Sequence, residues 1–484
     1  MLCVTGKEIT NQSLKQRIER TKARVSDCIQ EVRLDALTHI DNDTFSILKG
    51  FSKDLVVCCR PERQGGWYKG SEEDRLQLLD RVAQIGVAYL DIEADVPESR
   101  RQKFPRQGGT KRILSWHDFQ GIPEDLGNRL KEMSEGSADV VKVAVTINDV
   151  ADCVSLRQTS RTLRCPLVVI GMGPAGMVCR ARYPQFGSLW TYVFADDTDA
   201  TAPGQLSLNQ ALELGLPESA AKPFMALVGG PQIVHSPGPK VYNRLFRSRG
   251  LGYSYLLAIT KKPEATFALL KELGALGVSV TMPHKVAAFQ FGRPDQNARD
   301  AGAANTLRFT GAEVLATNTD IEGVAGPLRQ AIENRYGTTA SASSRKVLLL
   351  GDGGAARAAR LACLFLGLPL VVSSISEECA LAMGPDISFV SWEQRAAVKT
   401  PILINATMLG GADQDPWPAD QPIGRDIVFD LALGSGPSRL LRRAAPEGAT
   451  TIAAQEMWVF QGAEQMRFIT GQQFAASELR EYLP

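Results

Sequence analysis

Eight short runs of apolar, mostly β-branched residues recur through the first 195 residues and constrain the fold of this half of the chain. They are spaced by roughly 20–30 residues, and the stretches between them have the pattern of helices. Continuous apolar strands that alternate with helices are typical of parallel β-structure covered on both faces. Eight βα units in about 200 residues predict a (β/α)₈ barrel. The runs are LCVT (2–5), CIQEVRLD (28–35), DLVVCCR (54–60), VAYLDIEAD (87–95), RILSWHD (112–118), VVKVAVT (140–146), PLVVIGMG (166–173) and LWTYVFA (189–195).

Polar and ionisable side chains stand at or just beyond most of these predicted strands. In a barrel of this kind the chemistry lies at the carboxyl ends of the strands, so we expect these side chains to converge on one mouth. They are Glu31, Arg33, Asp35, Arg60, Asp91, Glu93, Ser115, His117, Asp118, Lys142, Arg180, Thr201 and Gln205.

Lys142 is the most informative of these residues because it interrupts the apolar run VVKVAV. An ammonium in a strand buried on both faces is costly, so the sequence predicts a lowered pKa and an amine nucleophile able to form a Schiff base with a ketone. His117, one strand away, is a suitable proton carrier, and several arginines at the same mouth suit a carboxylate substrate. Taken singly, the lysine could be a snorkelling edge residue, and the histidine and arginines could be structural.

Seven segments of this half resemble type I 3-dehydroquinate dehydratase, in order: EVRLD, LVVCCRPERQGGWYKG, YLDIEAD, ILSWHDF, ADVVKVAV, GMVCRARYPQFGS and TAPGQLS. The resemblance implies a TIM barrel in which Lys142 is the Schiff-base lysine, His117 the general acid/base and Glu93 the acid that orients the histidine. It also implies substrate-binding roles, with Arg180 on the substrate carboxylate. The other positions in this set are Glu31, Arg33, Arg60, Gln205 and Thr201, where the family usually has serine.

The alternation of strand and helix patterns ends near residues 214–223, in a stretch rich in Pro, Ala and Gly that is typical of a linker. The sequence therefore predicts a barrel over residues 1–216, a substrate-binding domain over 222–328 and a Rossmann nucleotide-binding domain over 329–454. We expect the C-terminal segment 455–484 to pack back on the second of these domains.

The segment KVLLLGDGGAARAAR (346–360) indicates a dinucleotide-binding turn, with a short strand before it and an alanine-rich helix after it. Gly351, Gly353 and Gly354 let the backbone approach a pyrophosphate, and the helix that opens near Ala355 stabilises its charge. The next strand ends in Ser373-Ser374-Ile375-Ser376, which has neither the acid typical of NAD sites nor the arginine typical of NADP sites.

The segments around this turn resemble shikimate dehydrogenase, again in order: VHSPGPKVYNRLF, VSVTMPHK, AGAANTL, ATNTDIEG, LINATMLG and MWVFQGAEQMRFITG. The resemblance implies a catalytic lysine at Lys285, with Asp320 as its partner, and NADP as cofactor, although NAD is not excluded. Hydride transfer to a ketone needs a proton for the developing alkoxide, which a lysine can donate. The other residues implied are Ser236, Thr281, Asn305 and Gln461 at the substrate, and Asn405 and Thr407 in a loop that flanks the cofactor.

Four positions of this second half depart from the family pattern. Gly238 stands where the carboxylate-binding turn usually has a second serine, Leu433 replaces a late tyrosine, Ala454 replaces a glycine and Ile375 replaces a basic residue of the NADP loop. Losing polar partners weakens shikimate binding, and a glycine makes room for the extra hydroxyl of quinate. The sequence thus leaves open a quinate dehydrogenase and a non-catalytic ligand-binding module for this half.

The remaining composition bounds the partners. The net charge is +1, which implies neither a nucleic-acid nor an anionic-membrane partner, and no apolar run reaches the roughly 18–20 residues of a membrane span. The nine cysteines have no zinc spacing, so we expect free thiols, no metal and a cytoplasmic protein. The leading hypothesis is a fused, bifunctional enzyme of the plant type, whose partners are small molecules: 3-dehydroquinate, 3-dehydroshikimate and shikimate.

Overall fold

The chain forms two compact units in the computed structural model, Met1–Ala275 and Leu276–Pro484. The structure describes residues 1–196, 200–337, 344–385, 387–410, 414–432, 434 and 436–483. None of the helices in these ranges combines the length and the apolar character that a bilayer crossing requires.

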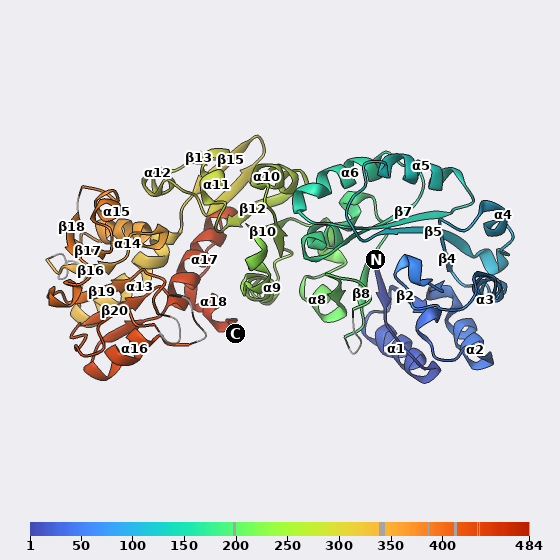
Figure 1. Cartoon of the computed structure of the whole chain (residues 1–484), viewed down its shortest axis with the longest axis horizontal. Helices are drawn as coiled ribbons and strands as arrows, with labels where there is room; N and C mark the ends of the chain where they lie inside the picture. Colours follow the sequence, from blue (N-terminus) through green and yellow to red (C-terminus); the bar gives the residue numbers. More distant parts are fainter. Residues whose placement is uncertain are drawn as a thin grey trace. The chain divides into compact units, whose positions relative to one another are not determined.

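The first unit begins with eight parallel strands in chain order. Seven of the eight predicted runs each contain one of these strands, and the run at 112–118 coincides with its strand to within one residue. The strands are β1 (Leu2–Thr5), β2 (Cys28–Arg33), β3 (Leu55–Cys58), β4 (Tyr89–Glu93), β5 (Lys111–Asp118), β6 (Val140–Thr146), β7 (Leu167–Met172) and β8 (Thr191–Phe194). The intervening helices lie outside the strands (Figure 1). They are α1 (Asn11–Arg24), α2 (Asn42–Phe51), α3 (Glu72–Ile85), α4 (Glu98–Arg101), α5 (Leu126–Glu135), α6 (Cys153–Arg161), α7 (Met177–Ala181) and α8 (Leu208–Glu213).

The ring of strands closes on both sides of β8. The strand itself pairs in parallel with β1, with Leu2 opposite Thr191. On the other side, Leu189 N donates to Leu167 O at 2.8 Å, and Ser188 Oγ accepts from Val169 N at 2.9 Å. The barrel prediction is therefore confirmed.

Side chains that point into the ring form an apolar floor beneath the mouth. They include Cys3, Ile113, Val140, Trp190 and Tyr192, all less than 7% exposed. An apolar floor holds polar groups only at the carboxyl ends of the strands, which concentrates the ionisable side chains at one end.

The first unit continues past the barrel through β9 (Leu206–Ser207), β10 (Phe224–Gly229), α9 (Gly238–Ser248), β11 (Ser254–Ile259) and α10 (Pro263–Glu272). Strands β10 and β11 pair in parallel. Buried contacts tie this part to the barrel: Arg182 donates to Ser219 O and Lys222 O, and Asp149 accepts from Thr260 Oγ1 at 2.6 Å. The stretch predicted as a linker is thus held by hydrogen bonds on its way from the barrel to β10.

The second unit starts with strands β12 to β15 and the helices between them, and the C-terminal helix α17 packs on these strands. Strands β12, β14 and β15 pair antiparallel in that order, and β13 pairs with β15. Gln465 on α17 accepts from Ser279 Oγ at 2.8 Å and donates to Asn305 O at 3.2 Å, so the C-terminal helix packs on these strands. The elements are β12 (Ala275–Val280), α11 (Lys285–Phe291), β13 (Arg293–Pro294), α12 (Gln296–Ala301), β14 (Thr306–Thr310), β15 (Glu313–Thr317), α13 (Asp320–Tyr336), α17 (Ala454–Thr470) and α18 (Ala476–Glu481).

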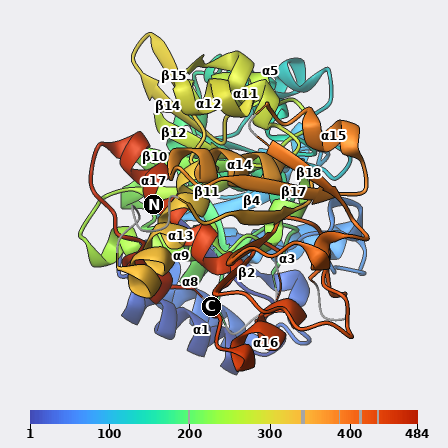
Figure 2. The ribbon, with the colours of Figure 1, turned by 90° about the vertical axis from the view of Figure 1, so that its left-hand side faces the viewer.

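The rest of this unit is a parallel sheet with the order β18-β17-β16-β19-β20-β21. Two apolar clusters cover its faces, one with α13 and α14 and the other with Trp417 and α16. Strands β17 and β18 lie side by side near α14 and α15 (Figure 2). This doubly wound sheet is the Rossmann arrangement that the glycine-rich turn predicted. Its elements are β16 (Val347–Leu350), α14 (Gly354–Phe365), β17 (Leu370–Ser374), α15 (Glu377–Leu381), β18 (Ile387–Ser391), β19 (Ile402–Asn405), β20 (Ile427–Asp430), α16 (Arg439–Ala444) and β21 (Thr450–Ile452).

Candidate functional sites

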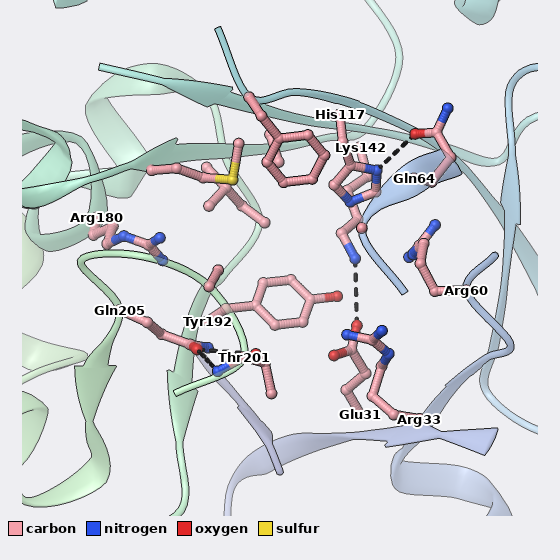
Figure 3. A pocket seen from close by; sticks show the side chains of 16 residues that line it. Glu31, Arg33, Arg60, Gln64, His117, Lys142, Arg180, Tyr192, Thr201 and Gln205 are labelled. Atoms are coloured by element: carbon pink, nitrogen blue, oxygen red, sulfur yellow. Dashed lines mark hydrogen bonds and ion pairs between the residues drawn. The ribbon is translucent and has the colours of Figure 1, made fainter. Parts of the chain in front are cut away.

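A cavity opens at the carboxyl ends of the barrel strands, and Figure 3 shows the side chains that line it. All but one of the barrel residues implied as site residues take part in its lining, and the exception is Glu93. The lining also contains residues that the sequence did not single out, among them Gln64, Phe119 and Tyr192.

Lys142 lies at the centre of this cavity and is 3% exposed. Its Nζ is 2.9 Å from Asp91 Oδ2 and 3.3 Å from Glu31 Oε1 (Figure 3 shows the contact with Glu31). The ring of Tyr192 lies beneath the amine, 4.5 Å from Nζ to the ring centroid. The position is consistent with a nucleophile that is held by its neighbours and shielded from water.

The prediction that burial lowers the pKa of Lys142 is wrong. Burial favours the neutral amine, but the charges of Asp91 and Glu31 outweigh it and raise the pKa of Lys142. The same interaction, together with Arg60, holds the pKa of Asp91 below its usual range despite burial. The resting side chain is therefore an ammonium between two carboxylates, and it must lose a proton before it can attack a carbonyl.

His117 lies on β5, which pairs with β6, the strand of Lys142. In this register Ser115 is opposite Lys142, and His117 is opposite Ala144, two residues further along. Burial lowers the pKa of His117 well below its usual value, and the positive charges of Arg60 and Lys142 add to this effect. A neutral imidazole in this place can accept a proton. His117 Nδ1 lies 3.2 Å from Gln64 Oε1, and since a carbonyl oxygen only accepts, Nδ1 carries the hydrogen and Nε2 keeps a lone pair.

Glu93 is placed differently from the expectation that it orients this histidine. It is fully buried and accepts hydrogen bonds from Arg60 at 2.8 Å and from Arg75 at 2.5 Å. Two guanidinium groups attract the carboxylate more strongly than a neutral ring would, which explains the difference. Gln64, in the loop four residues after Arg60, takes the place beside His117.

Three arginines reach the cavity with different partners. Arg60 is bound by Asp91, Glu93 and Ser115, and Arg33 is bound by Asp35 at 2.6 Å. Arg180 has no carboxylate partner among the described residues, although it is 1% exposed, and its Nε makes no hydrogen bond there. Burial lowers the pKa of Arg180 to about 10, so the group stays charged at neutral pH. A buried, uncompensated guanidinium suits a substrate carboxylate.

Thr201 and Gln205 lie together at the same cavity. Gln205 Oε1 accepts from Thr201 Oγ1 at 2.9 Å and from Thr201 N at 3.0 Å (Figure 3). The hydroxyl that replaces the usual serine is thus held in place by the amide, whose nitrogen remains available to a ligand.

The second unit contains another lysine–carboxylate pair. Lys285 is the first residue of α11 and Asp320 the first residue of α13, and Lys285 Nζ is 2.5 Å from Asp320 Oδ2. Asn305 Nδ2 donates to Asp320 Oδ1 at 2.9 Å and to Thr319 Oγ1 at 3.0 Å, and Thr319 Oγ1 lies 3.5 Å from Gln461 Oε1. The structure therefore brings four of the residues implied at the second site into one hydrogen-bonded group.

Two further residues implied at the second site have other hydrogen-bond partners, although Thr281 directly follows Val280, whose N–H donates to Asn305 O at 2.7 Å. Ser236 precedes α9 in the first unit, where its Oγ accepts from Gly238 N at 3.2 Å. Thr281 follows β12 in the second unit, and its carbonyl accepts from His284 N. Leu433 lies outside the described residues.

The glycine-rich turn fits a dinucleotide. Gly351 has φ +105°, and a Cβ there would meet Ala406 O at 3.1 Å, so the turn packs closely on the loop after β19. In that loop Asn405 Oδ1 accepts from Thr407 N at 3.1 Å and from Thr407 Oγ1 at 2.7 Å. The structure thus brings together the residues implied at the cofactor.

Open space remains on the side of the turn where a pyrophosphate would bind. Beside Gly353 and Gly354 a Cβ would meet nothing within 4 Å, and the free N–H groups at the start of the 12-residue helix α14 face an anion favourably. Asp352, in the same turn, accepts from Ser374 Oγ at 2.6 Å at the end of β17, where a ribose hydroxyl is expected.

Comparisons with known proteins match both units. Residues 2–214 match the family model of the type I 3-dehydroquinases, and residues 228–307 match that of the shikimate dehydrogenase substrate-binding domain. A bifunctional 3-dehydroquinate dehydratase/shikimate dehydrogenase of Arabidopsis thaliana is 27% identical over 94% of the chain and 80% of its own length.

Two relatives each match one half of the chain. A 3-dehydroquinate dehydratase of Desulfotalea psychrophila is 31% identical over 43% of the chain and 94% of its own length. An NADP(+) shikimate dehydrogenase of Maridesulfovibrio salexigens is 31% identical over 54% of the chain and 96% of its own length.

Proposed function

The chain belongs to the type I 3-dehydroquinate dehydratases in its first half and to the shikimate dehydrogenases in its second half, and from this premise we propose how its own residues perform the two reactions. The protein is a bifunctional enzyme that dehydrates 3-dehydroquinate and then reduces the product, 3-dehydroshikimate, to shikimate with NADPH. The product of the first reaction is the substrate of the second, which gives the fusion a chemical rationale.

Lys142 is the nucleophile of the dehydration. In the overall step its ammonium and the ketone give a protonated imine and water, and the Nζ–C bond replaces the C=O bond. Arg180 holds the substrate carboxylate, because it is the buried cation of the cavity that has no acidic partner in the part of the chain that the structure describes. The single observation that carries this assignment is the Lys142 amine, buried between Asp91 and Glu31 inside the cavity.

His117 is the base for the proton next to the imine carbon. Its lowered pKa keeps it neutral at neutral pH, and the contact with Gln64 leaves Nε2 free to accept. The imine withdraws the electrons left on carbon, the hydroxyl on the next carbon departs as water with the proton that His117 returns, and hydrolysis of the imine releases the enone.

Lys285 is the proton donor of the reduction. Bound NADPH supplies the hydride, and Lys285 gives a proton to the oxygen of the ketone as it becomes an alkoxide. Asp320 holds the ammonium at 2.5 Å, and Asn305 fixes the other carboxylate oxygen. The residues of the glycine-rich turn and of the loop with Asn405 and Thr407 bind the dinucleotide.

An assay of the two half-reactions on one sample tests this proposal. With 3-dehydroquinate alone, the ultraviolet absorbance of the enone should rise. When NADPH is then added, the absorbance of NADPH at longer wavelength should fall as it is oxidised. A sample that oxidises or reduces no substrate but still binds NADPH would show that the second half is a binding module.

Quinate is a second candidate substrate of the second half. A Cβ at Gly238 would approach Ser236 Oγ to 3.2 Å and the Tyr255 ring to 3.4 Å, so the glycine keeps a side chain out of a tight place, and quinate carries one hydroxyl more than shikimate. Turnover of quinate at a rate comparable to that of shikimate would support this candidate.

We also propose the domain boundaries expected from the sequence: a dehydratase barrel over 1–216, a substrate-binding domain over 222–328 completed by 455–484, and a nucleotide-binding domain over 329–454. The contacts of Gln465 with Ser279 and Asn305 support the assignment of the C-terminal segment.

The cysteines, which form no disulfide among the described residues, are consistent with a cytoplasmic location.

A further inference from the structure

Tyr192 is a buried titratable residue of the dehydratase cavity to which the mechanism above gives no role. It comes from β8, is 4% exposed and lines the cavity with its hydroxyl directed toward Lys142 and Glu31 (Figure 3). The side chains of Trp190 and Cys3 lie near the hydroxyl, but among the described residues none forms a hydrogen bond of ordinary distance and angle with it. Buried tyrosine hydroxyls usually find a partner, and an unsatisfied one destabilises the fold.

The other polar groups of the cavity are engaged. Lys142 contacts two carboxylates, His117 contacts Gln64, and Thr201 contacts Gln205. Among the described lining residues, Arg180 Nε and the Tyr192 hydroxyl are the buried side-chain atoms without a partner. Arg180 is matched by the substrate carboxylate, so the Tyr192 hydroxyl is the group for which a partner on the substrate remains to be assigned.

Two further observations identify that partner as an oxygen next to the Lys142 amine. The amine lies over the tyrosine ring at 4.5 Å, so a carbon bonded to Nζ lies near the ring, and in Figure 3 Tyr192 and His117 flank the amine from different sides. The hydroxyl also stays protonated, because burial and the nearby charges of Glu31 and Asp91 raise the pKa of Tyr192 well above its usual value. A permanently protonated hydroxyl serves as a donor.

We propose that the Tyr192 hydroxyl donates a hydrogen bond to the ketone oxygen of the substrate while Lys142 forms the imine. As the Nζ–C bond forms, the π-electron pair of the carbonyl moves onto that oxygen, and the donor stabilises the developing charge. The oxygen then takes the protons that leave the nitrogen and departs as water, so the tyrosine itself is neither consumed nor ionised. This inference rests on the proposed dehydratase function.

The variant Tyr192→Phe removes only the oxygen and leaves the ring beneath Lys142. Removing one donor to a developing oxyanion costs on the order of 10²-fold in rate, so we expect kcat for dehydration to fall by at least about tenfold, with a smaller change in KM. In a rapid-quench experiment with borohydride, the adduct with 3-dehydroquinate should form on Lys142 more slowly by a similar factor. The thermal midpoint should be unchanged or higher, since the Tyr192 hydroxyl forms no hydrogen bond of ordinary geometry with the described residues of the ligand-free protein.

Tyr183→Phe is the matched control, a buried tyrosine of the same barrel outside the cavity. It should leave the rate of adduct formation unchanged, and both variants should keep the dehydrogenase activity of the second half. Adduct formation by Tyr192→Phe within twofold of the parent rate would overturn the inference alone. Absence of an adduct in the parent protein would overturn the dehydratase proposal and the inference with it.

Discussion

The two lysines of this chain make similar contacts in very different surroundings. Lys142 is 3% exposed and lies between two carboxylates inside a barrel, whereas the Lys285 side chain is 29% exposed and contacts one carboxylate. An amine that forms a covalent imine must be kept from water, which would hydrolyse the intermediate early. An amine that donates a proton in every turnover must recover one from solvent, so partial exposure suits it. Burial, more than the ion pair, separates the two roles.

Exchanging each lysine for alanine tests the comparison with the largest expected effects. Lys142→Ala removes the nucleophile and should lower the dehydratase rate by at least about 10³-fold, while Lys285→Ala removes a proton donor and should lower the dehydrogenase rate by about 10²–10⁴-fold. Each variant is the control for the other, because the reaction of the other half should keep its parental rate. Loss of both activities in either variant would mean that the two sites are not independent.

A charged partner for His117 tests whether the first site depends on a neutral base. In Gln64→Glu the new carboxylate should raise the pKa of His117, because an opposite charge nearby favours the imidazolium. The acid limb of the dehydratase pH profile should then move to higher pH, because the imidazole is protonated over a wider range. Gln64→Met removes the contact without adding charge, so its rate should fall while the limb stays in place. An unchanged limb in Gln64→Glu would contradict the assigned role of Gln64.

Replacing one of the carboxylates beside Lys142 tests how far its charge controls the protonation of the amine. Because Asp91 raises the pKa of Lys142, the fraction of neutral amine grows as pH rises; Asp91→Asn should lower this pKa and shift the rise of kcat/KM for dehydration to lower pH. Asp320→Asn, the corresponding change at Lys285, should leave the dehydratase profile unchanged. If the pH profile of Asp91→Asn coincides with that of the parent protein, Asp91 does not control the loss of the proton from Lys142.

The smallest effect is expected at Gly238, and it concerns which substrate, shikimate or quinate, the site of Lys285 prefers. Gly238→Ser restores one neutral hydrogen-bonding group, worth about 0.5–1.5 kcal/mol, so the ratio of kcat/KM for shikimate over quinate should rise by about 2–10-fold. The contact distances around Gly238 leave room for a serine after small adjustments of Ser236. No change in the ratio would mean that this turn does not select between the two substrates.

The sequence predicted the barrel and its mouth because both depend on local patterns. Apolar runs at regular spacing gave all eight strands, and the rule that chemistry lies at carboxyl ends placed Lys142, His117 and Arg180 at one cavity. The Rossmann turn was equally predictable, since glycines at Gly351 and Gly353 between a strand and a helix have few other uses.

What the sequence did not predict depends on distances across the barrel. The direction of the Lys142 pKa shift was wrong because it is set by Asp91 and Glu31, which reach the amine from strands β4 and β2. Gln64 was missed because it ends a short 3-10 turn (Glu62–Gln64) after β3, where no periodic pattern marks a residue that faces the cavity. Tyr192 was counted only as part of an apolar strand, and its unpartnered hydroxyl becomes visible once the other side chains are placed around it.

Borohydride trapping is the most direct test of the claim that two separate amines carry the two reactions. The protein is incubated with 3-dehydroquinate and borohydride, digested, and its peptides are analysed by mass spectrometry. If the claim holds, one reduced adduct forms, on Lys142, while Lys285 stays unmodified; dehydratase activity is lost and dehydrogenase activity is retained. An adduct on Lys285, or an unmodified Lys142 in protein that continues to dehydrate the substrate, would contradict it.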